Sequence, residues 1–238
     1  MKVTEIWRYP VKTMAGEKLQ RARMGPLGID GDRVVHVEDA NGRVITSRSH
    51  PRFLGHKGTL GADGAPLVDG RPWNSPEVGS EVVEITGAGA KLVRYDGAER
   101  FDVLPLLVAT DGAIAAFGHD GRRLRPNLVI GGVEGMAERE WPGGCLRIGK
   151  VLVGVQDLRL RCIMTSYDPD TLVQDKEITR GIYRRFDGKL ALNCFVIEGG
   201  EISVGDEVDL VRGRACAESA AAAVFAETSD PASADKRR

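Results

Sequence analysis

The chain has 238 residues, with 33 lysines and arginines against 34 aspartates and glutamates, so its formal net charge is -1. A charged fraction of 28% beside a hydrophobic fraction of 42% is typical of a folded globular protein and excludes wholesale disorder or collagen-like repeats. The balanced charge argues against a mainly electrostatic nucleic-acid binder. The length allows one large domain or two small ones.

The sequence indicates a soluble, cytoplasmic protein without a membrane segment. No hydrophobic run approaches the ~20 residues of a membrane span, and the N-terminus has no signal-peptide core. The four cysteines show no CxxC and no short metal-ligand spacing, which fits a reducing compartment. We expect Cys145 and Cys194 to pack inside strands and Cys216 to be incidental.

Strand signals dominate the first half of the chain. Residues 2–11 are rich in strand formers, and residues 33–37 and 43–46 flank Asn41-Gly42, whose tolerance of positive φ predicts a hairpin. Residues 59–80 are rich in glycine and proline, which indicates loops and short edge strands. Residues 81–86 and 91–95 are expected to form a further strand pair.

Two short helices are predicted. The first spans Ala113–Phe117, where Thr110 or Asp111 can cap the start and Gly118 can end the helix. The second has hydrophobic residues at four-residue spacing, namely Ile178, Ile182 and Phe186.

The remaining pattern completes a mainly β, barrel-like fold with a few short helices and two closely packed β subdomains. Further strands are expected at Leu124–Ile130, Leu146–Ile148 and Val151–Val155, with a closing hairpin of Ala191–Glu198 and Glu201–Leu210 around Gly199-Gly200. Residues 214–238 are small, polar and of low complexity, so they are expected to form a flexible tail.

Cys162 is the strongest candidate for a nucleophile or a soft-metal ligand. It directly follows a predicted strand and stands beside Arg161. A nearby cation favours the thiolate, which both metal ligation and nucleophilic attack require. The alternative is a small buried hydrophobic cysteine, which is common at strand ends.

Basic and hydroxyl residues near the ends of predicted strands form a second candidate site. An arginine fork together with neutral hydroxyl donors can bind a phosphate, although each residue alone could equally be a solvated strand end. The residues of this group are Arg8, Lys12, Thr13, Arg33, Thr46, Ser47 and Arg48. Arg125 and Asn127, on either side of Pro126, add donors in a segment that could also be a structural turn.

A series of motifs in this order resembles the MOSC family, and more narrowly its members with an N-terminal MOSC β-barrel extension, such as the amidoxime-reducing proteins. The motifs are YPVKTMAGE, GIDGDR, VITSRSHPR, RLRPNLVI, LRIGKV, RCIMTSYDPDT and ISVGDEVDLV. The resemblance covers about residues 1–212. It implies an N-terminal barrel-like domain over residues 1–95, a MOSC domain over residues 96–213, and the tail beyond.

The resemblance also implies a molybdenum cofactor and assigns residues to it. Cys162 matches the molybdenum ligand, which suits the preference of a soft metal for thiolate. The residues that match cofactor-binding positions are Lys12, Thr13, Arg33, Thr46, Ser47, Arg48, Arg125, Asn127 and Arg161. Asp168 and Asp170 match the DPDT motif, to which we assign orientation of the loop after the ligand.

The sequence departs from the family pattern at two places near the ligand. Relatives with a C-x-R-C pattern have a cysteine where this chain has Arg159, and the paired threonines become Thr165-Ser166. No clustered cysteines follow for an iron–sulfur domain, so a reductase would need separate electron-transfer proteins of ferredoxin or cytochrome type.

Three hypotheses follow from these observations. The first is a molybdenum-dependent oxidoreductase that reduces small N-hydroxylated compounds, with no nucleic acid or membrane as partner. The second is a sulfur carrier or cofactor-handling protein in which Cys162 bears a persulfide. The third is an anion-binding β domain without turnover.

Overall fold

The computed structural model describes residues 1–213 and residue 216. In this part of the chain the protein is mainly β, with three α-helices and several single-turn 3-10 helices between the strands. The expectation of a mainly β fold with a few short helices is therefore confirmed. The predicted flexible tail lies outside the described residues, apart from Cys216.

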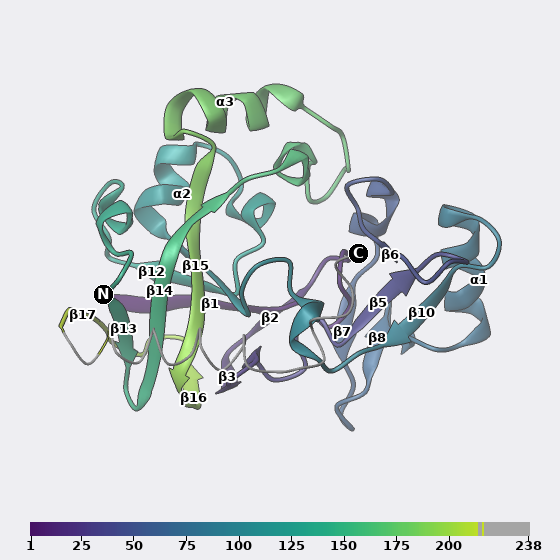
Figure 1. Ribbon diagram of the computed structural model, residues 1–238, viewed down its shortest axis with the longest axis horizontal. Helices are drawn as coiled ribbons and strands as arrows, with labels where there is room; N and C mark the ends of the chain where they lie inside the picture. The colour runs from purple at the N-terminus through teal and green to yellow at the C-terminus, as the bar shows by residue number, and fades with distance from the viewer. Residues whose placement is uncertain (214–215, 217–238) are drawn as a thin grey trace, which may run out of the picture.

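The largest element is an eight-stranded sheet, on the left in Figure 1. In spatial order its strands are β17 (Val208–Val211), β13 (Cys145–Ile148), β14 (Val151–Leu160), β15 (Lys189–Glu198), β11 (Leu106–Thr110), β12 (Leu128–Gly131), β1 (Lys2–Arg8) and β2 (Glu17–Leu19). Neighbouring strands are antiparallel except β11 and β12, which run parallel and are connected through α2 (Asp111–Phe117).

The sheet is built around one hydrophobic core. Ile6, Val108 and Leu128 occupy paired positions on three adjacent strands, and each is fully buried. Burying each such side chain contributes about 1.5–3 kcal/mol relative to exposure. The N-terminal strands β1 and β2 thus complete a sheet whose other strands lie between residues 106 and 211, and the predicted boundary at residue 95 stays a prediction.

The sheet is not a closed barrel. Lys2 of β1 forms an isolated bridge with Glu207, and the Val208 amide donates to the Met1 carbonyl at 2.9 Å. These contacts join β1 to the start of β17 at one end of the strands only.

Beside the large sheet, the described residues form three small sheets. The first two of them, together with helix α1 (Pro76–Thr86), make up a second body at the right of Figure 1. The first sheet joins β10 (Lys91–Arg94), β5 (Val35–Glu38) and β6 (Val44–Ile45); the second joins β7 (Gly58–Leu60), β8 (Pro66–Val68) and β9 (Arg71–Pro72); the third joins β16 (Gly200–Ser203), β3 (Arg21–Gly25) and β4 (Gly28–Ile29). The 3-10 helices are η1 (Pro51–Gly55), η2 (Ala98–Arg100), η3 (Gly121–Leu124), η4 (Ala137–Glu140) and η5 (Ile163–Ser166). A second hydrophobic core, around Phe53, belongs to this body.

The predicted strand at residues 81–86 is wrong, because these residues belong to helix α1 (Pro76–Thr86). The Ser75 hydroxyl accepts a hydrogen bond from the Val78 amide at 3.4 Å, and proline at the first helical position has a suitable fixed φ. Val78 and Val82 lie one turn apart and are both buried in the second core. The capping residues and the burial at helical spacing outweigh the strand preference of the β-branched side chains. The strand that was expected to pair with residues 81–86 is β10, and it pairs with β5 instead.

The predicted closing hairpin after residue 190 is also wrong. β15 and β16 follow each other in sequence, but β16 pairs with β3 and β17 pairs with β13. Gly199 lies between β15 and β16, and a Cβ there would come within 2.6 Å of the Met24 carbonyl oxygen. The glycine therefore lets the chain pass close to β3 rather than turn back on itself.

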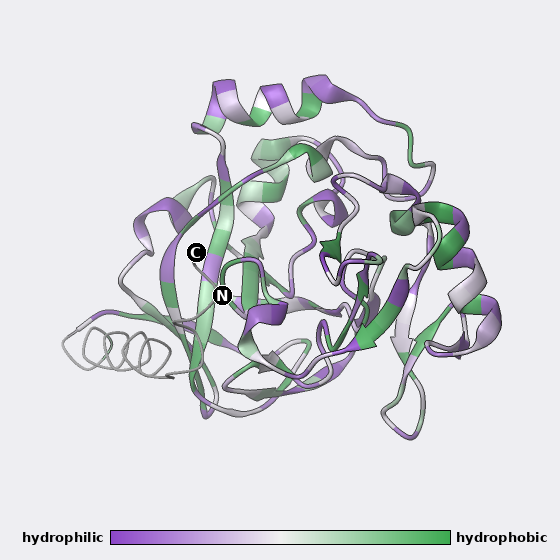
Figure 2. Ribbon diagram, turned by 45° about the vertical axis from the view of Figure 1, so that its right-hand side comes forward, coloured by the Kyte–Doolittle hydropathy of each residue, from purple (hydrophilic) through white to green (hydrophobic). Residues whose placement is uncertain are grey.

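Three local predictions are confirmed. β5 and β6 form the hairpin around Asn41-Gly42, with Gly42 at φ 76°. Thr110 caps α2 by accepting from the Ala113 amide at 3.1 Å, and Gly118 ends the helix in the left-handed region. The second helix is α3 (Lys176–Phe186), in which hydrophobic and hydrophilic bands alternate at the top of Figure 2.

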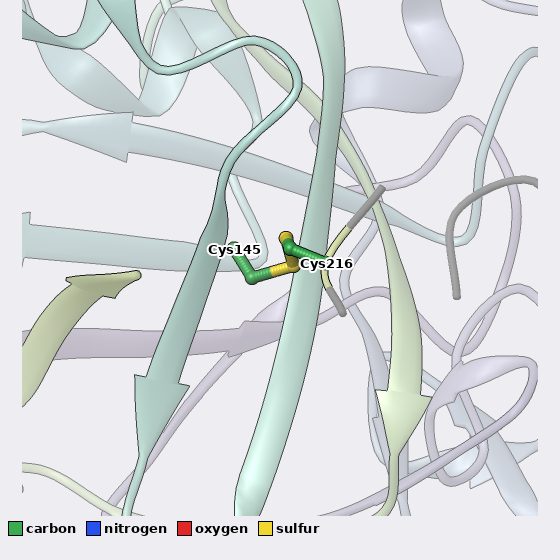
Figure 3. Close-up of a disulfide and its surroundings, with 2 residues drawn as sticks. All are labelled: Cys145 and Cys216. Carbon is green, nitrogen blue, oxygen red and sulfur yellow. A yellow bond between two sulfur atoms is a disulfide. The ribbon is translucent and has the colours of Figure 1, made fainter. Parts of the chain in front are cut away.

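The cysteines differ from the prediction. Cys145 of β13 and Cys216 form a disulfide, shown in Figure 3, so Cys216 is not incidental and Cys145 does more than pack in a strand. The disulfide ties the chain after β17 to β13, the second strand of the large sheet. Cys194 is buried in β15 as expected, and burial raises its pKa. Because disulfides are rare in reducing compartments, the cysteine count no longer supports the expected cytoplasmic location. In the described part of the chain, no helix has the length and hydrophobicity to cross a membrane.

Candidate functional site

A cavity of about 640 Å³ opens between the large sheet and the second body. Its lining comes from the loop after β6 as well as from β14 and β15. This volume is in the usual range for small-molecule sites, roughly 300–1,000 Å³. The predicted site residues that line it are Lys12, Thr13, Arg33, Thr46, Arg48, Arg125, Asn127, Arg161 and Cys162. Ser47 does not line the cavity, and Arg8 lies outside it, paired with Glu17 at 2.8 Å.

Three of the lining residues have a positive φ, a backbone conformation that residues other than glycine adopt only at an energetic cost. Thr13, Arg33 and Arg125 have φ values of 81°, 55° and 56°. Such residues cluster at functional sites, where surrounding contacts hold them in place. The strain is greatest for Thr13, whose side chain is β-branched.

Ser47 supplies the contacts that hold Thr13. The Ser47 amide donates to the Thr13 hydroxyl, the two hydroxyls contact each other, and the Ser47 hydroxyl lies 2.7 Å from the Thr13 carbonyl oxygen. Ser47 is therefore a buried support for the cavity wall. The hydroxyl of Thr13, expected to face a phosphate, is engaged by Ser47 in this structure.

Asn127 has a similar supporting role. Its side-chain amide group donates to the Trp7 carbonyl at 3.3 Å and to Asp32 at 3.2 Å. Its side-chain oxygen accepts from the Leu107 amide at 3.1 Å and lies 3.4 Å from the guanidinium of Arg33. Since both donors and both acceptor positions are used inside the protein, Asn127 aligns its neighbours rather than offering a free donor to the cavity.

Tyr9 and Asp32 contact the cations of the cavity, although the sequence did not single them out. The guanidinium groups of Arg125 and Arg33 lie 4.3 and 5.2 Å from the centre of the Tyr9 ring. Burial raises the pKa of Tyr9 to about 12 despite these two cations, and the phenol donates to the Pro126 carbonyl at 3.1 Å. Asp32, fully buried, accepts from Arg33 and from the Tyr9 amide. The sequence did offer one signal for Tyr9, because this residue directly precedes the Pro-Val-Lys segment that contains the candidate residue Lys12.

Asp102 forms ion pairs with two cations that line the cavity, Lys12 and Arg48. Its carboxylate lies 2.9 Å from the Lys12 ammonium and 2.8 Å from the Arg48 guanidinium. Burial opposes ionisation of Asp102, but Lys12, Arg48 and Arg159 keep its pKa below the usual value. Nothing in the sequence around Asp102 indicates this role, because its partners lie far away along the chain.

Cys162 lies between β14 and η5, directly before the first residue of η5, and its thiol is free and exposed at the cavity. The guanidinium of neighbouring Arg161 is buried and donates to the Leu124 carbonyl at 2.7 Å. Its Nε has no hydrogen-bond partner among residues 1–213 and 216. Burial lowers the pKa of Arg161 to about 10, so the group remains a cation at neutral pH. A buried cation with an unused donor beside a thiol is suited to an anionic ligand.

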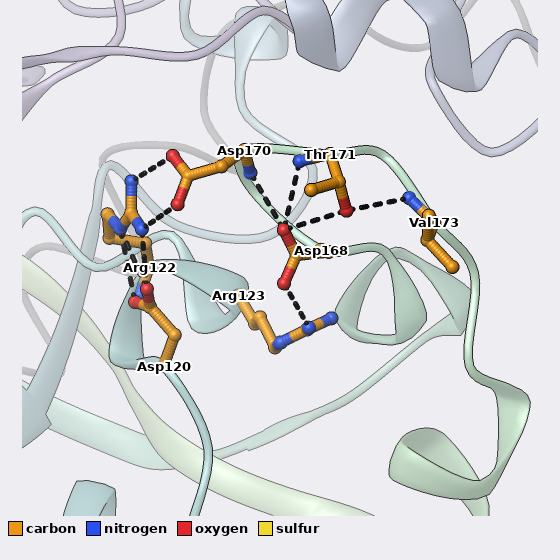
Figure 4. A network of polar contacts seen from close by, with 7 residues as sticks. All are labelled: Asp120, Arg122, Arg123, Asp168, Asp170, Thr171 and Val173. Atoms are coloured by element: carbon orange, nitrogen blue, oxygen red, sulfur yellow. Dashed lines mark hydrogen bonds and ion pairs between the residues drawn. The ribbon is translucent and has the colours of Figure 1, made fainter.

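Asp168 and Asp170 lie outside the cavity lining and hold the loop that follows η5, as Figure 4 shows. Arg122 binds Asp170 through two hydrogen bonds of 2.8 and 2.6 Å, and Arg123 binds Asp168 at 2.8 Å. Asp168 also accepts from the Thr171 amide at 2.9 Å. These contacts fasten the loop after Cys162 to η3, which leads directly into Arg125.

We expect Arg122→Gln to loosen this loop. Loss of the two-bond contact with Asp170 should raise amide hydrogen exchange in residues 168–173 about two- to fivefold, measured by mass spectrometry. Arg180→Gln, which removes an exposed pair with Glu177 on α3, serves as the matched control. Unchanged exchange in the loop of the Arg122 variant would show that Asp170 does not fasten it.

Comparison with family models identifies the class of protein. Residues 1–69 match the MOSC N-terminal beta barrel domain, and residues 113–209 match the MOSC domain. The chain therefore belongs to the MOSC family, and within it to the proteins that carry the N-terminal barrel domain.

Individual relatives lie at low identity over most of the chain. It is 25% identical to the mitochondrial amidoxime-reducing component 1 of Homo sapiens over 285 aligned positions, covering 88% of this chain and 82% of that protein. The Mus musculus protein of the same name is 24% identical with the same coverage. Among solved structures, the YuaD protein from Bacillus subtilis has a TM-score of 0.47 at 12% identity, covering 90% of this chain and 96% of that one. YiiM from Escherichia coli has a TM-score of 0.45 at 12% identity, covering 92% and 76%.

Proposed function

We propose that the protein is a molybdenum-cofactor oxidoreductase that reduces N-hydroxylated compounds, with Cys162 as the molybdenum ligand. The observation that carries the proposal is the cavity, in which a free thiol stands beside buried Arg161 and half-buried cations from distant parts of the chain. The names of the relatives, which describe amidoxime reduction, support the substrate class.

The residues present fit such a cofactor. A thiolate is a soft ligand suited to a redox-active metal, and arginine and lysine side chains suit a phosphate. The unused Nε of Arg161 provides a buried donor for an anionic group. Asp102 and Asp32 offset part of the positive charge, yet Arg125 and Arg161 have no carboxylate within salt-bridge distance among the described residues.

Each part of the chain has a definite task in this proposal. Lys12 and Arg33 bind the cofactor phosphate, and Asn127 with Asp32 holds Arg33 in position. Arg125 and Arg161, anchored by carbonyl oxygens, present positive charge along the cavity wall. The tyrosine ring against Arg33 and Arg125 limits their movement. The cavity walls thus orient a substrate beside Cys162.

A bound molybdenum centre supplies two-electron removal of an oxygen atom. The overall reaction is reduction of a C=N–OH group with two electrons and two protons to C=NH and water. In this proposal a separate protein of ferredoxin or cytochrome type supplies the electrons. A cytoplasmic location stays a prediction.

The test uses protein purified from a host that makes molybdenum cofactor. With reduced methyl viologen as electron donor, the wild type should convert benzamidoxime to benzamidine, and Cys162→Ala should fall to the background rate. Cys194→Ala, a change at a buried cysteine that does not line the cavity, is the matched control. Absence of conversion by metal-loaded wild type would refute the reductase assignment.

A second candidate function is favoured by the exposure of the Cys162 thiol. An accessible thiol beside a cation could carry a persulfide and deliver sulfur to a metal centre. Metal-free protein whose Cys162 yields cyanide-reactive sulfur would support this role and not the reductase. An anion-binding domain without turnover would show neither activity.

A further inference from the structure

The cavity has a group of lining residues that the cofactor assignments leave unexplained. Arg159, Leu160, Tyr183 and Lys189 come from the end of β14, from α3 and from the start of β15. Leu160 and Lys189 are paired across the two strands. We call this group the β14–β15 rim; Arg159 and Leu160 lie close to Cys162 in sequence, and all four residues line the same cavity as Cys162.

Arg159 is the cation of the rim with unused binding capacity. Its guanidinium lies 3.5 Å from the Asn193 side-chain oxygen and 3.9 Å from Asp102, both longer than an ordinary hydrogen bond. Asp102 is already held at shorter distance by Lys12 and Arg48. The side chain is 21% exposed, so it is largely removed from water without a close counterion.

The other acidic residue in the lining does not satisfy Arg159. Asp157 accepts from the Asn193 side-chain amide at 2.6 Å. Lys189 adds a second positive charge to the rim, and no ion pair to its ammonium is found in residues 1–213 and 216. The rim therefore has more positive than negative charge next to the thiol.

The rim also has hydrophobic surface. Leu160 and Tyr183 are 57% and 49% exposed, high values for large hydrophobic side chains, and both line the cavity. A Cβ at Gly188 would lie 2.8 Å from the Tyr183 ring and 3.1 Å from Leu160, so the two side chains flank the same point. Exposed hydrophobic surface in a cavity mouth is suited to an apolar part of a ligand.

We propose that the β14–β15 rim binds a carboxylate of the substrate through Arg159, and that Leu160 and Tyr183 contact the aromatic or aliphatic part of the same substrate. The substrate class is then N-hydroxylated compounds that carry a carboxylate on an aromatic or aliphatic body. This inference rests on the proposed function for the reaction, but the binding step can be measured without it. Arginine suits the task because its planar fork binds a carboxylate through two hydrogen bonds.

The test compares two probes of equal shape, 4-carboxybenzamidoxime and the neutral 4-carbamoylbenzamidoxime. Their dissociation constants are measured by calorimetry in metal-free protein and in a buffer without phosphate, because phosphate would compete with the carboxylate for Arg159. The wild type should bind the carboxylate probe about 10- to 100-fold more tightly, as charge-assisted hydrogen bonds predict. In Arg159→Gln this ratio should fall to near one, and Arg159→Lys should retain part of it.

Two controls make the result specific. Arg147→Gln, which removes an exposed cation on β13 away from the cavity, should keep the wild-type ratio. In metal-loaded protein the same ratio should appear in kcat/KM. Equal affinity for the two probes in the wild type, or a preference that survives in Arg159→Gln, would overturn the proposal. Selective binding without any reduction would support the rim as an anion site and refute the reductase function separately.

Discussion

Removing two cations of the proposed phosphate site should greatly weaken cofactor retention. In the double variant Lys12→Gln/Arg33→Gln we expect cofactor affinity to fall about 10²- to 10⁴-fold, since each charge-assisted phosphate contact contributes about 1.5–3 kcal/mol. Both side chains line the cavity and come from different loops of the N-terminal half. The measurement is the pterin remaining after gel filtration, quantified by fluorescence of its oxidised form.

The control for this variant is Arg23→Gln, which changes an exposed arginine paired only loosely with Asp30 at 3.8 Å. A thermal unfolding curve shows whether each variant is folded, because Arg33→Gln also removes a partner of buried Asp32. If the folded double variant retained all of its pterin, Lys12 and Arg33 would not be the residues that bind the cofactor phosphate.

Replacing buried Glu138 should stabilise the protein above neutral pH. Glu138 lies in η4, fully buried, with one carboxylate oxygen accepting from Thr110 and the other without a partner in the described residues. Burial raises the pKa of Glu138 from its usual 4.5 to about 7, against the opposing effect of the hydrogen bond from Thr110. The native state therefore binds the proton more tightly than the unfolded chain does.

The direction of the pH effect follows from this shift. Glu138 contributes its full stability below pH 4.5, and this contribution is lost as the pH rises to about 7. Glutamine has the shape of the protonated carboxyl group, so Glu138→Gln should raise the free energy of unfolding at pH 8 by up to about 3 kcal/mol relative to wild type. Urea unfolding at pH 5 and pH 8 tests this. A stability difference between variant and wild type that does not change with pH would contradict the shifted pKa.

Local sequence signals predicted those elements whose stabilising contacts are also local. The cap at Thr110, the left-handed Gly118 and the Asn41-Gly42 turn each act within a few residues, and all three are found in the structure. Helix α3 was recognisable because Ile178, Ile182 and Phe186 share one buried face.

Elements that depend on distant partners could not be derived in this way. β16 pairs with β3 nearly 180 residues earlier, although its position after β15 favoured a hairpin. The disulfide joins cysteines with a sequence separation of 71. In α1, β-branched residues favoured a strand, and the Ser75-Pro76 start decided the outcome.

In the candidate site, too, some features could be predicted from local sequence and others depend on distant residues. All the residues assigned to the cofactor from the motif resemblance, except Ser47, line a single cavity, but the resemblance gave no indication of what holds them there. Tyr9, Asp32 and Asp102 act through contacts with residues far along the chain, and Asp102 is itself in a segment without a distinctive motif. Ser47 and Asn127 prove to support the cavity wall rather than to face it freely.

The central claim is that the cavity holds a molybdenum cofactor at Cys162. Its most direct test is the molybdenum and pterin content of wild type and Cys162→Ala, purified from a host that makes the cofactor, by mass spectrometry and fluorescence. We predict about one molybdenum and one pterin per wild-type chain, with the metal lost in the variant. Wild-type protein that contains neither metal nor pterin but carries a persulfide on Cys162 would contradict the account.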